Sequence, residues 1–322
     1  MYDCLDPLRL DPASNPPVAQ LGSPAVDFGP ISRGGRGELY RSAQKDPLVR
    51  AVGIRNLFAM LTPSRDINDL SSEHRILDVL GGDGVLARAI SQLALPGSAP
   101  SVLTSDVSED MVAAARAYGL FALCQAAQNL FLKDDIMNGV IIAYGTHHIP
   151  RDQLVWACSE ALRVLKPGSR IVLHDFEVNS PMSRWFGEVV DPYSLTGHNF
   201  PHFTRGEIEE CLHKAGFVDI TLQYMYDPFI LTADSAEEAE SLLAKYLLNM
   251  YGLVKPLDGG SYEEVLGRIY SLTLEYFKYD YEGMGLDESF GAPEVQVFKK
   301  DGCWHIEAPR VALVGCGVKP QI

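Results

Sequence analysis

The sequence lacks any long apolar run. No stretch of its 322 residues reaches the roughly 20 apolar residues that span a bilayer. It also opens without the succession of charged, apolar and small residues that is typical of a secretory signal. We therefore expect a cytoplasmic protein that has no membrane partner.

Clustered positive charge is missing too. Lys and Arg number 27 against 42 Asp and Glu, which gives a formal net charge of −15. Nucleic-acid binding needs clustered Lys and Arg to meet the phosphates, so this composition argues against a nucleic-acid partner. The six cysteines show no C-x-x-C spacing, and we expect them to be reduced and buried. Hydrophobic residues make up 47% of the chain, enough for one core with substantial additions.

The chain is organised around residues 76–84, ILDVLGGDG, where a short apolar strand containing Asp78 runs into a glycine turn. The glycines permit positive φ and let the backbone lie against a ligand, and the helix that follows aims free N–H groups at it. Residues 82–87 also satisfy the G-x-G-x-x-A dinucleotide pattern, which is a weak signal alone. Asp78 argues against a dinucleotide site, because a carboxylate in an apolar strand needs a buried cationic partner, such as an amine on the ligand.

Four segments together resemble the class I S-adenosylmethionine (SAM) dependent methyltransferases. Residues 76–84 resemble motif I, residues 101–106 (SVLTSD) the second strand with its acid, residues 139–150 (GVIIAYGTHHIP) the fourth strand, and residues 161–173 (ALRVLKPGSRIVL) the turn before strand five. The resemblance covers about residues 75–224. It implies an α/β fold with a Rossmann-like seven-stranded methyltransferase sheet, and an enzyme that uses SAM.

The resemblance also implies which residues serve the cofactor. Asp78 would meet the methionine end of SAM and Asp106 the ribose hydroxyls, while Gln125 stands where the family often has an Asp for the adenine amine. A Gln carbonyl can still accept from an amine. Tyr40 and Arg41 could touch the SAM carboxylate or could simply pack at the surface. The predicted cofactor-binding residues are Tyr40, Asp78, Gly81, Gly82, Gly84, Asp106, Val107, Gln125, Ala126 and Tyr144.

Helical and strand patterns outside the core predict four parts. Residues 1–70 form an arm and helices that cover the cofactor, and residues 71–233 form the SAM-binding core. Residues 234–293 form a helical cap insertion, and residues 294–322 form a hairpin and a last strand that complete the core. The helices of the insertion would either cap the acceptor pocket or form the face of a homodimer, since an apolar stripe buries equally well against a second subunit.

Candidate residues on the acceptor side follow strands four and five. His147 and His148 would act as a base or shape the pocket, and Asp175 would hold an acceptor ammonium or take a proton. The alternatives are a purely structural His pair and a solvated strand end. No metal is expected, because Pro201 breaks helical spacing between His198 and His202 and no acid or Cys at a set spacing completes a site. The substrate-binding candidates, for which cap packing is the alternative, are Glu177, Trp185, Tyr193, His198, His202 and Tyr226.

The function that fits these features is methyl transfer from SAM to a small-molecule acceptor, an amino-acid-like metabolite or a natural product. The sequence leaves open whether nitrogen, sulfur, oxygen or carbon is methylated, since a base is needed only where the acceptor atom holds a proton. Two alternatives stay open. One is a protein of this fold that binds SAM without methylating, as a cyclase or scaffold does, and the other is an NAD-dependent oxidoreductase.

Overall fold

The computed structural model describes residues 27–255 and 260–321, and the arm expected at the N-terminus lies largely outside them. A seven-stranded sheet in the order β3-β2-β1-β4-β5-β10-β6 forms the centre of the protein. Strands β1 to β5 are parallel, and β10 runs antiparallel between β5 and β6. The strands are β1 Arg75–Asp78, β2 Ser101–Asp106, β3 Phe121–Cys124, β4 Met137–Ile142, β5 Leu165–Asp175, β6 Val218–Tyr226 and β10 Val311–Val318. The predicted α/β fold is confirmed, with the last strand at the expected place.

Helices cover both faces of this sheet. Side chains of α6 and α9 pack on one face around Leu77, Val140 and Leu173, and side chains of α3 and α4 pack on the other around Ile76 and Ile141. Adjacent strand residues thus point to opposite faces, as expected for a sheet covered on both sides. The helices are α2 Gly37–Ala43, α3 Ala51–Ala59, α4 Val85–Leu93, α5 Glu109–Ala117, α6 Arg151–Val164 and α9 Arg205–Ala215, with short 3-10 turns at Ile31–Arg33, Pro47–Arg50, Ile67–Asp69 and Thr146–His148.

Local sequence signals set the ends of α9. The Thr204 side chain accepts from the Glu207 N–H while the Glu207 side chain accepts from the Thr204 N–H, so the capping box that the sequence predicts is present. Gly216 ends the helix with φ of 99°, a conformation that glycine adopts without a steric penalty. Pro47 likewise separates α2 from α3, because a proline inside a helix removes a hydrogen bond.

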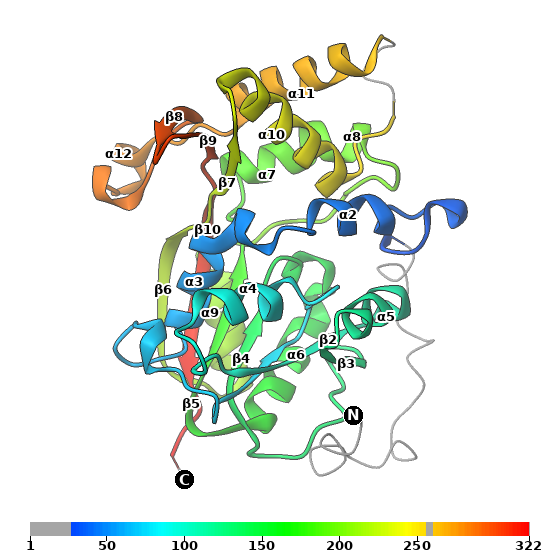
Figure 1. Cartoon of the computed structure of the whole chain (residues 1–322). Coiled ribbons are helices and arrows are strands. Elements are labelled where there is room, and N and C mark those ends of the chain that lie inside the picture. The colour runs from blue at the N-terminus through cyan, green and yellow to red at the C-terminus, as the bar shows by residue number, and fades with distance from the viewer. Residues whose placement is uncertain (1–26, 256–259, 322) are drawn as a thin grey trace.

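A second layer of structure sits beside the large sheet, and Figure 1 shows it above the sheet, with α2 between the two. Its helices and the large sheet share one continuous apolar core, which runs from Ile76 and Phe58 to Leu243 and Ile269. No helix among the described residues is both long and apolar enough to cross a bilayer. The elements of this layer are α7 Pro181–Trp185, a π-helical turn Phe186–Val190, α8 Asp191–Tyr193, β7 Phe229–Ala233, α10 Ala236–Tyr251, α11 Tyr262–Tyr276, α12 Tyr281–Met284, a 3-10 turn Glu288–Phe290, β8 Gln296–Lys300 and β9 Cys303–Ala308.

The predicted C-terminal hairpin forms but does not join the large sheet. β8 and β9 meet at Asp301 and Gly302, which have φ of 50° and 87°, as the turn of a two-residue hairpin requires. β9 then pairs with β7, which gives a separate three-stranded sheet in the order β7-β9-β8. Two residues separate β6 from β7, and β7 offers β9 a free edge. β10 occupies the place next to β6 in the large sheet.

The contact between α9 and β10 gives a test of the packing. A Cβ on Gly315 would lie 2.5 Å from Ile208 Cγ2 and 2.9 Å from Leu212 Cδ1, so Gly315→Ala should lower the free energy of unfolding by about 1–3 kcal/mol. A Cβ on Gly267 in α11 meets nothing within 4 Å, so Gly267→Ala should raise that free energy by about 0.5–1 kcal/mol. Urea denaturation measures both, and equal effects of the two variants would contradict this packing.

Candidate functional site

The turn between β1 and α4 holds a buried carboxylate. Asp78, the last residue of β1, is 1% exposed, and within the described chain its Oδ2 has no hydrogen-bond partner. Burial first, and then the nearby Asp106 carboxylate, raise the pKa of Asp78 to about 8. A Cβ on Gly81 would lie 2.7 Å from the Asp78 Oδ2, so only a glycine leaves the carboxylate its room. An ammonium group is the ligand that suits such a buried oxygen.

Asp106, at the end of β2, binds the glycine turn. Its Oδ2 accepts a hydrogen bond from the Gly82 N–H at 2.9 Å, and its Oδ1 accepts from the Ser108 N–H at 2.8 Å. Burial raises the pKa of Asp106 to about 6, and these N–H groups limit the rise. The group is therefore ionised at neutral pH, and each oxygen keeps a lone pair that can accept from a ligand hydroxyl.

A cavity of about 480 Å³ opens beside this turn, and we name it the turn cavity. It brings together residues that are far apart in the sequence, as the carboxyl ends of parallel strands do. The predicted cofactor-binding residues in its wall are Tyr40, Gly82, Asp106, Val107 and Tyr144. The other lining residues are Phe28, Leu80, Met111, Gly145 and His148, of which His148 was predicted for the acceptor side.

Gln125 and Ala126 follow β3 but are not among the residues that line the turn cavity. The Gln125 Oε1 accepts a hydrogen bond from the Phe131 N–H at 2.9 Å. The carbonyl that was expected to accept from an adenine amine is therefore bound to the chain itself. Within the described residues, the Gln125 Nε2 has no partner and remains a donor.

Arg50 is a site residue that the sequence did not reveal. It is 3% exposed, its guanidinium lies 3.4 Å from the centre of the Tyr144 ring, and its Nε has no hydrogen-bond partner in the part of the chain described. No carboxylate among the described residues forms an ion pair with it. A buried cation in this state is suited to an anionic ligand. Nothing in the sequence around Arg50 marks it, since most arginines lie at the surface.

A second cavity of about 460 Å³ adjoins the first, and we name it the imidazole cavity. Phe28, Tyr40, Tyr144 and His148 line both cavities. Met250 and Tyr251, at the end of α10, bring the second layer of the structure to this wall. The remaining lining residues are Arg36, Arg50, His147, Phe176, Phe186, His198 and Arg310.

Asp175, at the end of β5, holds His147 in one orientation. Its Oδ2 accepts from the His147 N–H at 2.7 Å and contacts the His147 Nδ1 at 2.9 Å. Its Oδ1 accepts from the Phe176 N–H at 2.7 Å and contacts the His202 Nδ1 at 3.1 Å. Burial alone would raise the pKa of Asp175, but these imidazoles hold it well below its usual range. Because the ionised carboxylate only accepts, the His147 Nδ1 carries the proton and Nε2 keeps its lone pair.

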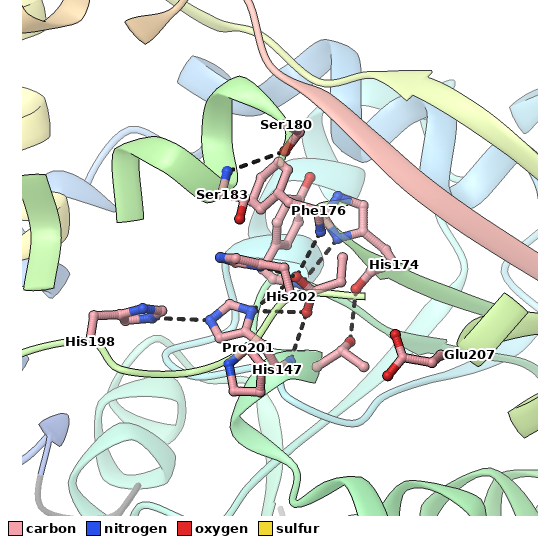
Figure 2. A network of polar contacts seen from close by, with 12 residues as sticks. His147, His174, Phe176, Ser180, Ser183, His198, Pro201, His202 and Glu207 are labelled. Carbon is pink, nitrogen blue, oxygen red and sulfur yellow. Dashed lines mark hydrogen bonds and ion pairs between the residues drawn. The ribbon is translucent and has the colours of Figure 1, made fainter. Parts of the chain in front are cut away.

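Two further histidines join this network, as Figure 2 shows. The His147 Nε2 lies 3.1 Å from the His198 Nε2. The His202 Nδ1 contacts the Asp175 Oδ1, and its ring centre is 5.0 Å from that of His147. Burial is the main cause that lowers the pKa of His148, His198 and His202, so these imidazoles are neutral at physiological pH. His148 and His198 line the imidazole cavity, and His202 lies behind it.

The other predicted substrate residues lie outside the walls of both cavities. Trp185 is fully buried against Tyr251, Tyr276 and Phe277. The Tyr226 hydroxyl donates to Glu307 at 2.5 Å, and Glu177 accepts from the Tyr224 hydroxyl at 2.5 Å. Tyr193 packs against the shared core.

Tyr144 lines both cavities where they adjoin, and other side chains fix its position. Its φ of 62° is in the left-handed region, which is rare for an aromatic residue and indicates a fixed backbone. Its hydroxyl donates to the Asp227 Oδ1 at 3.0 Å, and Asp227 in turn forms a buried ion pair with Arg310. Asp227 directly follows β6 and Arg310 directly precedes β10, and no local pattern in the sequence marks either residue.

Known proteins resemble the chain over the same region. The family model of the methyltransferase domain matches residues 76–168. A ubiquinone/menaquinone biosynthesis C-methyltransferase UbiE of Saccharophagus degradans is 27% identical over 193 residues, which cover 56% of this chain and 74% of that protein. The UbiE protein of Azotobacter vinelandii is 27% identical over 196 residues, which cover 58% and 74%.

Solved structures align over most of the chain. A putative methyltransferase of Haloferax volcanii, in complex with the activator Trm112, is 16% identical and gives a TM-score of 0.49, with 89% of this chain and 97% of that chain covered. A putative methyltransferase of Bacillus halodurans is 19% identical and gives a TM-score of 0.45, with 79% and 96% covered. The matched domain, its relatives and the glycine turn with its two acids identify the chain as a class I SAM-dependent methyltransferase.

Proposed function

We propose that this enzyme methylates a compact aromatic or enolic small molecule that binds in the imidazole cavity. The observation that carries the proposal is the common wall of the two cavities, formed by Phe28, Tyr40, Tyr144 and His148. A cofactor in the turn cavity and an acceptor in the imidazole cavity would meet at this wall. Direct contact is what an in-line displacement needs, because the acceptor lone pair must lie behind the methyl carbon.

The groups that SAM requires lie in the turn cavity and next to it. Asp106 lines this cavity, Asp78 ends β1 beside the glycine turn, and Arg50 lines the adjoining imidazole cavity against the Tyr144 ring. The buried Asp78 carboxylate would accept from the ammonium group, and the Arg50 guanidinium would bind the carboxylate at the same end of the molecule. Asp106 would accept from the ribose hydroxyls. Bound SAM supplies a methyl group whose bond to sulfur breaks as the acceptor lone pair bonds to carbon, with the electron pair passing to sulfur to leave S-adenosylhomocysteine.

The imidazole cavity favours a flat acceptor. Phe28, Phe176, Phe186 and Tyr251 offer aromatic faces, and α10 encloses the site through Met250 and Tyr251. The UbiE relatives are named for C-methylation in quinone biosynthesis, and their names support an acceptor of phenolic or enolic type. We interpret the insertion as a cap over this acceptor, since the C-terminal end of its first helix, α10, lies in the cavity wall.

His147 is the residue placed to activate such an acceptor. Asp175 fixes its Nδ1 proton, and the Nε2 lone pair is then available to the acceptor's hydroxyl or enol group. Tyr144 would position the two reactants, because its ring lies in both walls while Asp227 holds its hydroxyl.

The direct test is methyl transfer from SAM to a panel of phenols and enolic acids. We expect a product that gains the mass of one methylene, and a product about three mass units heavier still when SAM carries a deuterated methyl group, since three deuterium atoms replace three hydrogen atoms. Protein that binds S-adenosylhomocysteine but methylates nothing in the panel, or in a metabolite extract, would contradict the proposal and favour a fold that binds SAM without methylating.

Asp78→Asn should separate binding from stability. The amide removes the charge that meets the ammonium group, so affinity for S-adenosylhomocysteine should fall by about 100-fold or more. It also removes a carboxylate that burial disfavours, so the midpoint of thermal unfolding without ligand should rise at pH 8 and above. Calorimetric titration and thermal scans measure the two effects. Asp301→Asn in the exposed turn between β8 and β9 is the control, and it should change neither quantity.

Affinity for S-adenosylhomocysteine should depend on pH through Asp78. Its pKa of about 8 in the free protein means that a proton occupies the carboxylate at lower pH and must leave when the ammonium group binds. The association constant should therefore rise between pH 6 and 8, by up to about tenfold per pH unit, and level off above the pKa. Calorimetry in buffers of different ionisation enthalpy detects the released proton. An equally steep rise for Asp78→Asn would assign the effect to another group.

Asp175→Asn should lower the rate of catalysis and leave cofactor binding unchanged. The two carboxylate oxygens accept from four donors. An amide NH2 in place of one oxygen would face donors and could not accept from them, so His147 would lose its orientation. The kcat for the acceptor found in the panel should fall by about 100-fold, while affinity for S-adenosylhomocysteine stays unchanged. Asp110→Asn on the exposed side of α5 is the control. An unchanged kcat for Asp175→Asn would exclude His147 as the activating group.

A further inference from the structure

Three imidazoles converge in the wall of the imidazole cavity. His147 and His148 come from the turn after β4, and His198 comes from the segment that follows α8. Ligand nitrogens of the three lie within 4.8 Å of one another. All three side chains line the same cavity, so a group bound between them would face the acceptor.

The closest pair already has the spacing of two ligands on one ion. The His147 Nε2 and the His198 Nε2 are 3.1 Å apart, and two nitrogens on a tetrahedral zinc ion are about 3.3 Å apart. Without an ion these two nitrogens share one proton, and the His148 Nδ1 and His198 Nδ1 have no partner within the described residues.

Asp175 supplies the outer support that metal-binding imidazoles usually have. Its contact with the His147 Nδ1 fixes the tautomer in which Nε2 faces the cavity. The nearby Arg36 guanidinium, which would oppose a cation, forms an ion pair with Asp27 at 2.9 Å. The ring of His198 stacks on Phe186 with 4.4 Å between the ring centres, which holds the second ligand in place.

We propose that His147, His148 and His198 bind one divalent transition-metal ion of the zinc type, with an oxygen of the methyl acceptor as the fourth ligand. This inference rests on the proposed function and specifies how the acceptor is held. The His147 Nε2 lone pair would bind the ion in place of acting as a base, and the coordinated hydroxyl or enol, whose pKa the ion would lower, would release its proton to solvent. It departs from the expectation of no metal, which considered His198 and His202 by their spacing in the sequence. The structure pairs His198 with a histidine 51 residues away instead.

The other group of possible ligands, His147, Asp175 and His202, is less suited to an ion. Both Asp175 oxygens accept from backbone N–H groups, and both contact the His147 Nδ1 at 2.9–3.0 Å. An ion there would have to displace these bonds. His202 is also not among the residues that line the imidazole cavity, so an ion bound there would not meet the acceptor.

The test is titration of the full chain with Co²⁺, which gives a strong visible spectrum when four-coordinate, followed by displacement with Zn²⁺. The protein is purified without a polyhistidine tag and freed of metal with a chelator. We expect one equivalent per chain. His147→Ala, His148→Ala and His198→Ala should each weaken binding by about 100-fold or more, and Asp175→Asn by about 10–100-fold. His213→Ala, on the exposed side of α9, should bind as the wild type does.

Two results would overturn the metal site. Wild-type protein that binds S-adenosylhomocysteine but no Co²⁺ would exclude it and leave the proposed function standing. Loss of Co²⁺ binding in His202→Ala, with binding kept in His148→Ala, would place the ion at the other group. Titration with S-adenosylhomocysteine shows that the variants of His147, His198 and His202 are folded, because these residues are not among those that line the turn cavity. His148 does line that cavity, so the midpoint of thermal unfolding is the folding control for His148→Ala.

Discussion

The acceptor side of this protein depends on the hydrogen bonds to Asp175. One carboxylate at the end of β5 binds the turn after β4 through His147 and the loop before α9 through His202. Three segments that are separate in the sequence thereby acquire fixed positions around one buried charge. The loop before α9 has no regular secondary structure of its own, so these contacts replace the backbone ladder that would otherwise order it.

The sequence predicted that the two acids and the glycine turn lie together, because that arrangement follows from strand topology. Asp78, Asp106 and the glycines lie at the carboxyl ends of adjacent parallel strands, so a local pattern fixes their neighbours. Arg50 was missed, since its burial depends on the packing of α10 and Tyr144, which no local pattern reports. The contact of His147 with His198 was missed for the same reason, and the carbonyl of Gln125 is bound by Phe131, a partner that its position after β3 did not indicate.

The second layer, which we propose as a cap, is part of the core and not a separate lid. Apolar side chains of α3 and α4 belong to the same buried cluster as those of α10 and α11. Displacing the cap as a rigid body would expose this shared surface, at a cost that grows with the apolar area uncovered. Access to the imidazole cavity is therefore easier through local movement of its rim, where Phe28 and Met250 lie, than through hinge opening of the whole layer.

The position of β10 has a consequence for synthesis on the ribosome. This strand is made after β5 and β6, yet it lies between them and pairs with both. Until it emerges, those two strands have unpaired edges, and Arg310, which neutralises the buried Asp227, is not yet in place. The nascent chain can thus form the glycine turn before β10 is made but can close its sheet only after β10 emerges, and the exposed strand edges favour aggregation in that interval.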